Sequence, residues 1–177
     1  MALNKVINVG VLTDDTRKII NDNLPDISKV TTAFSQSAST TLANVVGLLS
    51  DTLQPGTYDV DINLITTAGA SGGVKLALKW GTASMITATA LAVQANSAAA
   101  TANTTFTTST DAASLLAGTA AYVNVKVKGT ITVALAGTIQ LQAAQNVSDA
   151  TATTVALGST MSFTPIGATT PLAGALV

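Results

Sequence analysis

The chain has 177 residues, the size of one ordinary domain with a short appendage. Charged residues make up only 10% of it, against roughly 25% in a typical soluble domain. Because so few charges cannot cover the surface of a monomer, we expect part of the surface to be hidden in a homo-oligomer. The formal net charge of -1 provides no basic field for phosphates, so we do not expect nucleic acid as a partner.

The sequence contains neither histidine nor cysteine. Their absence excludes Ser-His-Asp and Cys-His catalysis, imidazole metal centres and disulfide frameworks. We therefore expect a protein that is not an enzyme and that uses no cofactor and no metal. No apolar run approaches the ~18 residues of a membrane-spanning helix, and the N-terminus lacks the pattern of a signal peptide. These features predict synthesis in the cytoplasm and no membrane partner.

The N-terminal residues differ in composition from the rest of the chain, because eight of the 17 charged residues lie within residues 1–29. A short helix is predicted over residues 14–23, with Thr13 as its N-cap and Pro25 after its end. The preceding apolar residues, 3–12, have a pattern that suits a strand added to an exposed sheet edge. We therefore assign residues 1–28 to an attachment arm and residues 29–177 to the main domain. The predicted attachment residues are Leu3, Val6, Ile7, Val9, Val11, Leu12, Arg17, Lys18 and Ile20.

From Lys29 onward the apolar residues follow a period of two, which is typical of half-buried strands. Apolar and polar residues alternate in residues 57–64 and again in residues 74–80. Gly69–Gly73 supplies turn chemistry between these two runs. We interpret the two runs as a β-hairpin.

Further strands are predicted toward the C-terminus. Residues 123–135 alternate between apolar and polar residues, and Gly129 is expected to divide them into two strands. Another strand is expected over residues 139–142, after Gly137. Residues 88–110 consist mainly of Ala, Thr, Ser and Asn and predict a weak strand followed by a long surface loop. Short strands separated by glycines indicate an all-β sandwich or a closed jelly roll.

Three segments resemble strands of C1q/TNF-like jelly rolls. Pro55-Gly56-Thr57-Tyr58 is similar to their PG-x-Y strand, residues 135–142 (LAGTIQLQ) to their L-x-x-G-D-x-V-x-L-Q strand pair, and residues 30–35 (VTTAFS) to their first strand. The same order of motifs, with TLANV at residues 41–45 and LGSTM at residues 157–161, resembles small phage virion proteins, including capsid decoration or cement proteins and fibre heads. The resemblance covers residues 29–177. Thr138 stands where the C1q motif has Asp, so no calcium or ligand role is transferred.

The resemblance implies a trimeric jelly-roll β-sandwich with a short N-terminal arm. The implied function is that of a non-enzymatic virion structural protein, a capsid decoration (cement) protein that binds the outer surface of a phage head as a homotrimer. The implied partners are the chain itself and the major capsid protein, and the implied location is the virion surface. The alternative is a fibre or tailspike head that binds a host-surface glycan, with residues 88–110 as the contact loop. Chain length favours decoration, since fibres usually add a long shaft before the head.

Two aspartates are the strongest candidates for catalysis. Asp59 and Asp61 share one face of a strand at a spacing of about 6.6–7 Å. Paired-carboxylate hydrolases use spacings in this range. A solvated strand face is the simpler interpretation, and we assign no catalytic residue.

Other motifs have simple structural interpretations. Gly69–Lys75 lacks the Gly-Lys-Ser/Thr ending of a phosphate loop and is interpreted as a turn. Lys126 and Lys128 share a polar strand face and are interpreted as solvated or edge-protecting lysines, with binding of an anion or of a partner's aspartate as the alternative. Trp80 is interpreted as a core residue, with stacking on a sugar as the alternative.

Overall fold

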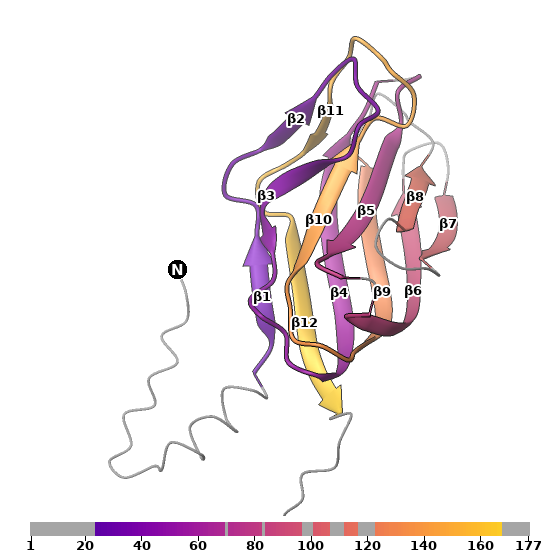
Figure 1. Cartoon of the computed structure of the whole chain (residues 1–177). Coiled ribbons are helices and arrows are strands. Elements are labelled where there is room, and N and C mark those ends of the chain that lie inside the picture. Colours follow the sequence, from indigo (N-terminus) through magenta and orange to yellow (C-terminus); the bar gives the residue numbers. More distant parts are fainter. Residues whose placement is uncertain are drawn as a thin grey trace, which may run out of the picture.

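The computed structural model describes residues 24–69, 71–82, 84–96, 101–106, 112–116 and 123–167. These residues form an all-β structure, as predicted, with strands in two antiparallel sheets that pack as a β-sandwich (Figure 1). The described part of the chain contains no helix. The helix predicted over residues 14–23 lies outside the described residues. The strands are β1 (Asp26–Lys29), β2 (Phe34–Gln36), β3 (Ala43–Leu49), β4 (Gly56–Thr67), β5 (Val74–Trp80), β6 (Ile86–Asn96), β7 (Thr101–Phe106), β8 (Ala112–Leu116), β9 (Val123–Val133), β10 (Ile139–Ala144), β11 (Thr153–Val155) and β12 (Thr160–Gly167).

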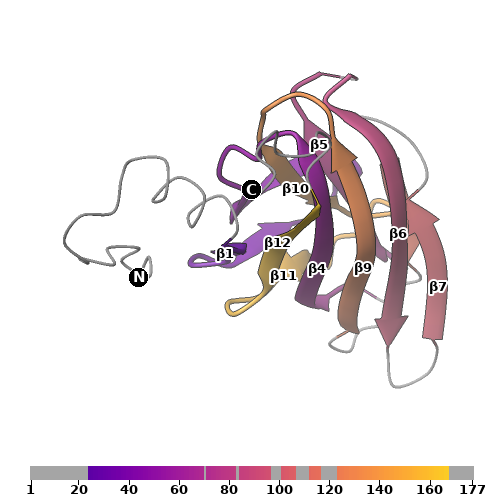
Figure 2. The same ribbon diagram turned by 90° about the horizontal axis from the view of Figure 1, so that it is seen from below.

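The larger sheet has the strand order β1-β12-β4-β9-β6-β7, and β11 joins it by pairing with both β4 and β2. The smaller sheet has the order β3-β10-β5-β8. Figure 2 shows the strands of the larger sheet side by side. At one margin of the sandwich β1 lies against β3, and at the other margin β7 lies against β8. The two sheets therefore approach each other along both sides.

The main pairings join strands that lie far apart in the sequence. β1 pairs with β12, β3 with β10, β4 with β9 and β5 with β8. Each pair is nested within the preceding one, so the chain resembles one long hairpin rolled into two layers. β6 and β7 form a hairpin inserted between β5 and β8, and β6 attaches it to the larger sheet by pairing with β9.

The predicted hairpin of residues 57–64 and 74–80 is wrong, although both strands exist. β4 pairs with β12 and β9 in the larger sheet, whereas β5 pairs with β10 and β8 in the smaller sheet. The connection still contains the expected turn, because the Gly72 N–H donates to the Gly69 carbonyl at 3.1 Å. This turn carries the chain from one layer to the other. Alternation predicts which side chains face the core, but not which strand lies alongside.

Gly129 does not end a strand as predicted, because β9 is continuous through it. Gly129 has a φ of +147°. A Cβ at this position would collide with the Ala90 carbonyl of β6. The glycine therefore permits the close approach of two paired strands. Leu135, expected in the second strand, follows the end of β9 and is exposed.

The long loop predicted within residues 88–110 is also wrong, because β6 and β7 form a hairpin there. They pair from Leu91 opposite Phe106 to Asn96 opposite Thr101. In β6, Leu91 and Val93 are buried while Ala90 is exposed. Alternation of this kind is hard to recognise when the exposed positions hold alanine rather than a polar residue.

The first strand begins earlier than the motif at residues 30–35 predicted. β1 covers Asp26–Lys29 and pairs with β12, whereas residues 30–33 lie outside any strand. Most of β1 therefore falls within residues 1–28, the segment assigned to the arm. The part of that segment before Leu24 lies outside the described residues.

One apolar core fills the space between the sheets. On β4 the four alternating apolar residues, from Tyr58 to Leu64, are all buried, as predicted. Leu141 of β10 and Phe163 of β12 join the same core. Trp80 is only 5% exposed and is a core residue, which confirms its structural interpretation.

We expect Gly129→Ala to lower the free energy of unfolding by about 2–4 kcal/mol, because it combines an unfavourable φ with a steric clash. Gly158→Ala is the matched control. Gly158 also has a positive φ, +85°, but no atom lies within 4 Å of its Cβ position, so only about 1–2 kcal/mol should be lost. Urea denaturation measures both values. Equal losses would contradict a close approach of β6 and β9 at Gly129.

Candidate functional site

The predicted aspartate pair lies on the solvent face of β4, in the middle of the larger sheet. Asp61 is opposite Lys128 of β9 and opposite Ser162 of β12. Asp59 is opposite threonines on the same two strands. The alternation of β4 therefore places both carboxylates outward, as predicted.

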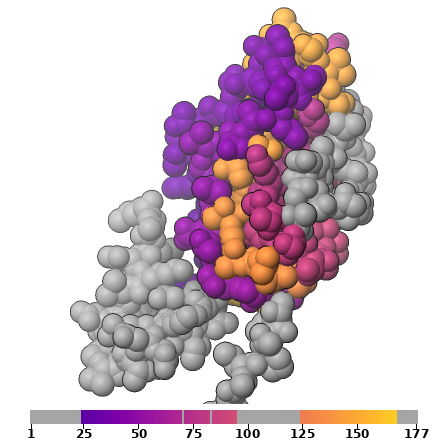
Figure 3. Space-filling model, viewed as in Figure 1, coloured from indigo at the N-terminus to yellow at the C-terminus, as the bar shows by residue number. Residues whose placement is uncertain are grey.

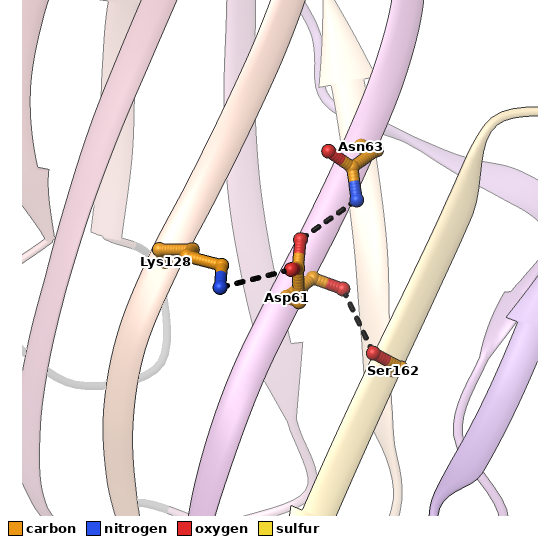
Figure 4. Close-up of polar contacts among 4 residues, drawn as sticks. All are labelled: Asp61, Asn63, Lys128 and Ser162. Carbon is orange, nitrogen blue, oxygen red and sulfur yellow. Dashed lines mark hydrogen bonds and ion pairs between the residues drawn. The ribbon is translucent and has the colours of Figure 1, made fainter.

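The Asp61 carboxylate is held by two neighbouring side chains (Figure 4). Lys128 Nζ lies 3.3 Å from Asp61 Oδ2, and the Asn63 amide donates to Asp61 Oδ1 at 2.7 Å. The Ser162 hydroxyl donates to the Asp61 backbone carbonyl at 3.2 Å. Each carboxylate oxygen thus has a polar partner within the chain.

The charges of Asp61 and Lys128 have a structural explanation that involves no reaction. The Lys128 side chain is 55% exposed and the Asp61 side chain 29% exposed, so the pair is a surface ion pair worth about 0–1 kcal/mol. A catalytic pair needs one carboxyl group poised to give up or accept a proton. The contacts of Asp61 suit charge neutralisation on a sheet face better than proton transfer.

The two lysines on the outer face of β9, Lys126 and Lys128, have different neighbours. Lys128 interacts with Asp61 of its own chain, whereas Lys126 lies opposite Asn63. Both lysines are exposed on the outer face of β9. β9 is flanked by β4 and β6, so these lysines do not protect a sheet edge. They are solvated side chains on a central strand.

A buried glutamine that the sequence analysis missed organises one end of the sandwich. Gln145 is fully buried, and its Oε1 accepts from the N–H groups of Ser39 at 3.2 Å and Asp149 at 3.0 Å. Its Nε2 donates to the carbonyls of Asp149 at 3.0 Å and Thr151 at 2.8 Å. One side chain therefore satisfies four backbone groups from two separate connections. A lone glutamine carries no sequence signal for such a role.

The predicted turn Gly69–Lys75 packs beside this glutamine. The Val147 N–H donates to the Gly72 carbonyl at 2.8 Å, and the buried Thr153 hydroxyl donates to the Gly73 carbonyl at 2.9 Å. Gly73 has a φ of +61°, which suits a turn. These contacts hold the turn against the chain rather than leaving a cradle of N–H groups for phosphate.

The predicted attachment residues, from Leu3 to Ile20, lie outside the described residues. Within the described part of the chain, no three acidic, histidine or cysteine residues gather as a metal site. None of the described segments is a helix long and apolar enough to cross a membrane.

No protein-family model matches the chain, and a search of curated proteins found no relative.

We expect Gln145→Leu to lower the free energy of unfolding by about 2–4 kcal/mol, because it leaves buried backbone groups without partners. Gln94→Leu is the control, since Gln94 is exposed on β6 and should change stability by less than about 0.5 kcal/mol. Thermal and urea unfolding measure both. A Gln145 variant as stable as the control would contradict its role at this end of the sandwich.

Proposed function

We propose that the chain is a non-enzymatic virion structural protein, a decoration or cement protein that binds the outside of a phage head as a jelly-roll homotrimer. The observation that carries the proposal is the nesting of strand pairs. The inserted hairpin of β6 and β7 and the short strands β2 and β11 can be set aside. The remaining eight strands are then renumbered 1 to 8 in chain order. Their order is 1-8-3-6 in the larger sheet (β1-β12-β4-β9) and 2-7-4-5 in the smaller sheet (β3-β10-β5-β8). These orders are those expected of a hairpin rolled into two layers, and they support a jelly roll, a fold common in viral capsid proteins and lectins.

The motifs at residues 55–58 and 135–142 each lead into a strand, whereas residues 30–33 of the first-strand motif lie outside any strand. Gly56 begins β4, and the Tyr58 hydroxyl donates to the Gln54 carbonyl at 2.7 Å, which ties the Pro55-Gly56 corner to the strand. Residues 135–142 run from the end of β9 into β10. Both of these motifs therefore contribute residues to the sandwich.

The surface chemistry supports a structural task. The sequence lacks histidine and cysteine, and both carboxylate oxygens of Asp61 have polar partners within the chain. The outer face of the larger sheet is covered mainly by short uncharged side chains, such as Thr164 of β12, Thr130 of β9 and Ala92 of β6. Such a surface suits contact with other subunits.

The fibre-head alternative relied on a long contact loop, and the structure has no such loop at the expected place in the described residues. Its contact loop was expected within residues 88–110, where β6 and β7 instead extend the larger sheet. We therefore favour decoration, with synthesis in the host cytoplasm and final location on the capsid exterior.

Residues 1–23 are the proposed shell anchor. Within the described residues, the sandwich has strand ladders and an apolar core. Arg17 and Lys18 supply positive charge for acidic residues of a capsid protein. The apolar arm residues supply buried area for the contact.

We expect the purified protein to be a trimer. Light scattering coupled to size exclusion should give three times the mass of one chain at micromolar concentration. A monomer under these conditions would remove the homotrimer from the proposal.

We expect deletion of residues 1–23 to abolish co-sedimentation with capsids of the parent phage while the trimer persists. The deletion stops before β1, because β1 pairs with β12. Lys126→Ala combined with Lys128→Ala is the control, and should bind capsids like the parent protein. A truncated protein that binds with unchanged affinity would show that attachment uses the sandwich instead.

A further inference from the structure

One end of the sandwich, which we call the lower end from its place in Figure 1, contains three connections that hydrogen-bond to one another. They join β3 to β4, β5 to β6 and β9 to β10. Leu53 and Gly137 exchange backbone hydrogen bonds of 2.8 Å and 3.1 Å, and the Ala134 N–H donates to the Met85 carbonyl at 2.7 Å. In Figure 3, purple atoms of the first connection and orange atoms of the last lie at this end.

The first and last strands of the sandwich meet at the lower end. β1 and β12 are antiparallel, with Asp26 opposite Phe163, so β1 begins beside the last part of β12. Gly167 lies opposite Thr57, at the beginning of β4. Twenty-three residues precede Leu24 and ten follow Gly167. Both terminal segments of the chain therefore join the sandwich at this end.

Three exposed apolar side chains lie at the lower end. Leu24, just before β1, is 40% exposed, Leu135, just after β9, is 52% exposed, and Ile166, near the end of β12, is 57% exposed. The described connections at the opposite end, around the buried Gln145, contribute one large apolar residue of this kind, Val147, which is 55% exposed. The lower end is therefore the more apolar of the two.

The length of the sandwich limits which end the proposed anchor can hold against a shell. β4 runs from one end to the other in 12 residues, a distance of about 36 Å. Arg17 and Lys18, the positive charges of the anchor, stand seven and six residues before Leu24. Seven residues span at most roughly 25 Å when fully extended. Both side chains can therefore reach a shell beneath the lower end, whereas a shell beneath the opposite end lies beyond their reach.

We propose that the lower end of the sandwich faces the capsid protein, and that Leu135 and Ile166 contact an uncharged, apolar part of its surface. The inference rests on the proposed decoration function and deepens it, because it states which end of the domain contacts the shell. The anchor and the lower end then form one continuous attachment surface, with Leu24 between them. Burial of these apolar side chains adds favourable free energy to the contact. The end that contains Gln145 points away from the shell.

Thiol labelling tests the orientation directly, because the native chain contains no cysteine. Leu135→Cys and Val147→Cys each place one thiol on the full-length chain, at opposite ends and at positions of similar exposure. On capsids of the parent phage that lack the native protein, the thiol at position 135 should react with a maleimide about tenfold more slowly than in the free protein, because the shell covers it. The thiol at position 147 should react at the same rate in both states.

Sedimentation of both variants and of the parent protein with capsids is measured first. If none of them sediments with capsids, the decoration function and this inference are both wrong. If they sediment but the thiol at position 135 reacts as fast as in the free protein, the decoration function stands and the orientation is wrong. Protection of the thiol at position 147 instead would show that the opposite end faces the shell.

Charge insertion provides a second measurement on the full chain. Leu135→Asp combined with Ile166→Asp should weaken capsid binding about tenfold or more, because it places unpaired charges in an apolar contact. Light scattering and circular dichroism should remain those of the parent protein, since both side chains are exposed. Val147→Asp is the matched control at the opposite end and should bind capsids like the parent. Unchanged capsid affinity of the double variant would contradict a contact at the lower end.

Discussion

The ladder between β4 and β9 is the contact on which the rest of the sandwich depends. It joins eleven residue pairs, from Gly56 opposite Val133 to Thr66 opposite Val123. β4 also pairs with β12 and β11, and β9 also pairs with β6, so five strands of the larger sheet are positioned by this ladder. Its inner face supplies core residues, and its outer face carries the pair of Asp61 and Lys128. Gly129 keeps the ladder continuous where the Ala90 carbonyl of β6 lies against β9.

Nested pairing has consequences for both folding and function. Strands far apart in the sequence must meet before the core closes, which is typical of slowly folding β proteins. Once closed, the described part of the sandwich keeps its charges on the surface, and Gln145 pairs four backbone groups through its hydrogen bonds. Gln36 Oε1 and Trp80 Nε1 are the buried side-chain atoms of the described residues that lack a hydrogen-bond partner. A domain of this kind, with few charges and several exposed apolar side chains, suits the proposed role in an assembly.

The sequence predicted the all-β class and the buried face of β4, because alternation from Tyr58 to Leu64 is a local property. It did not predict that β4 and β5 belong to different sheets, because partner choice depends on contacts distant in the sequence. Gly129 was interpreted as a strand end, since a positive φ within a strand leaves no composition signal. The hairpin of β6 and β7 was missed because alanine and threonine conceal the alternation. At the candidate site, the outward placement of Asp59 and Asp61 was predictable. The ion pair of Asp61 with Lys128 was not predictable, because it depends on the register between β4 and β9.

Electron cryomicroscopy of the parent phage particle is the most direct test of the proposed role. Particles that carry this protein should show density for three sandwiches around each attachment point on the outer surface of the head, and particles lacking the gene product should lose that density. The two-layer shape with its inserted hairpin makes the domain recognisable at moderate resolution. Density for this fold on the tail, or heads that are identical with and without the protein, would contradict a decoration protein.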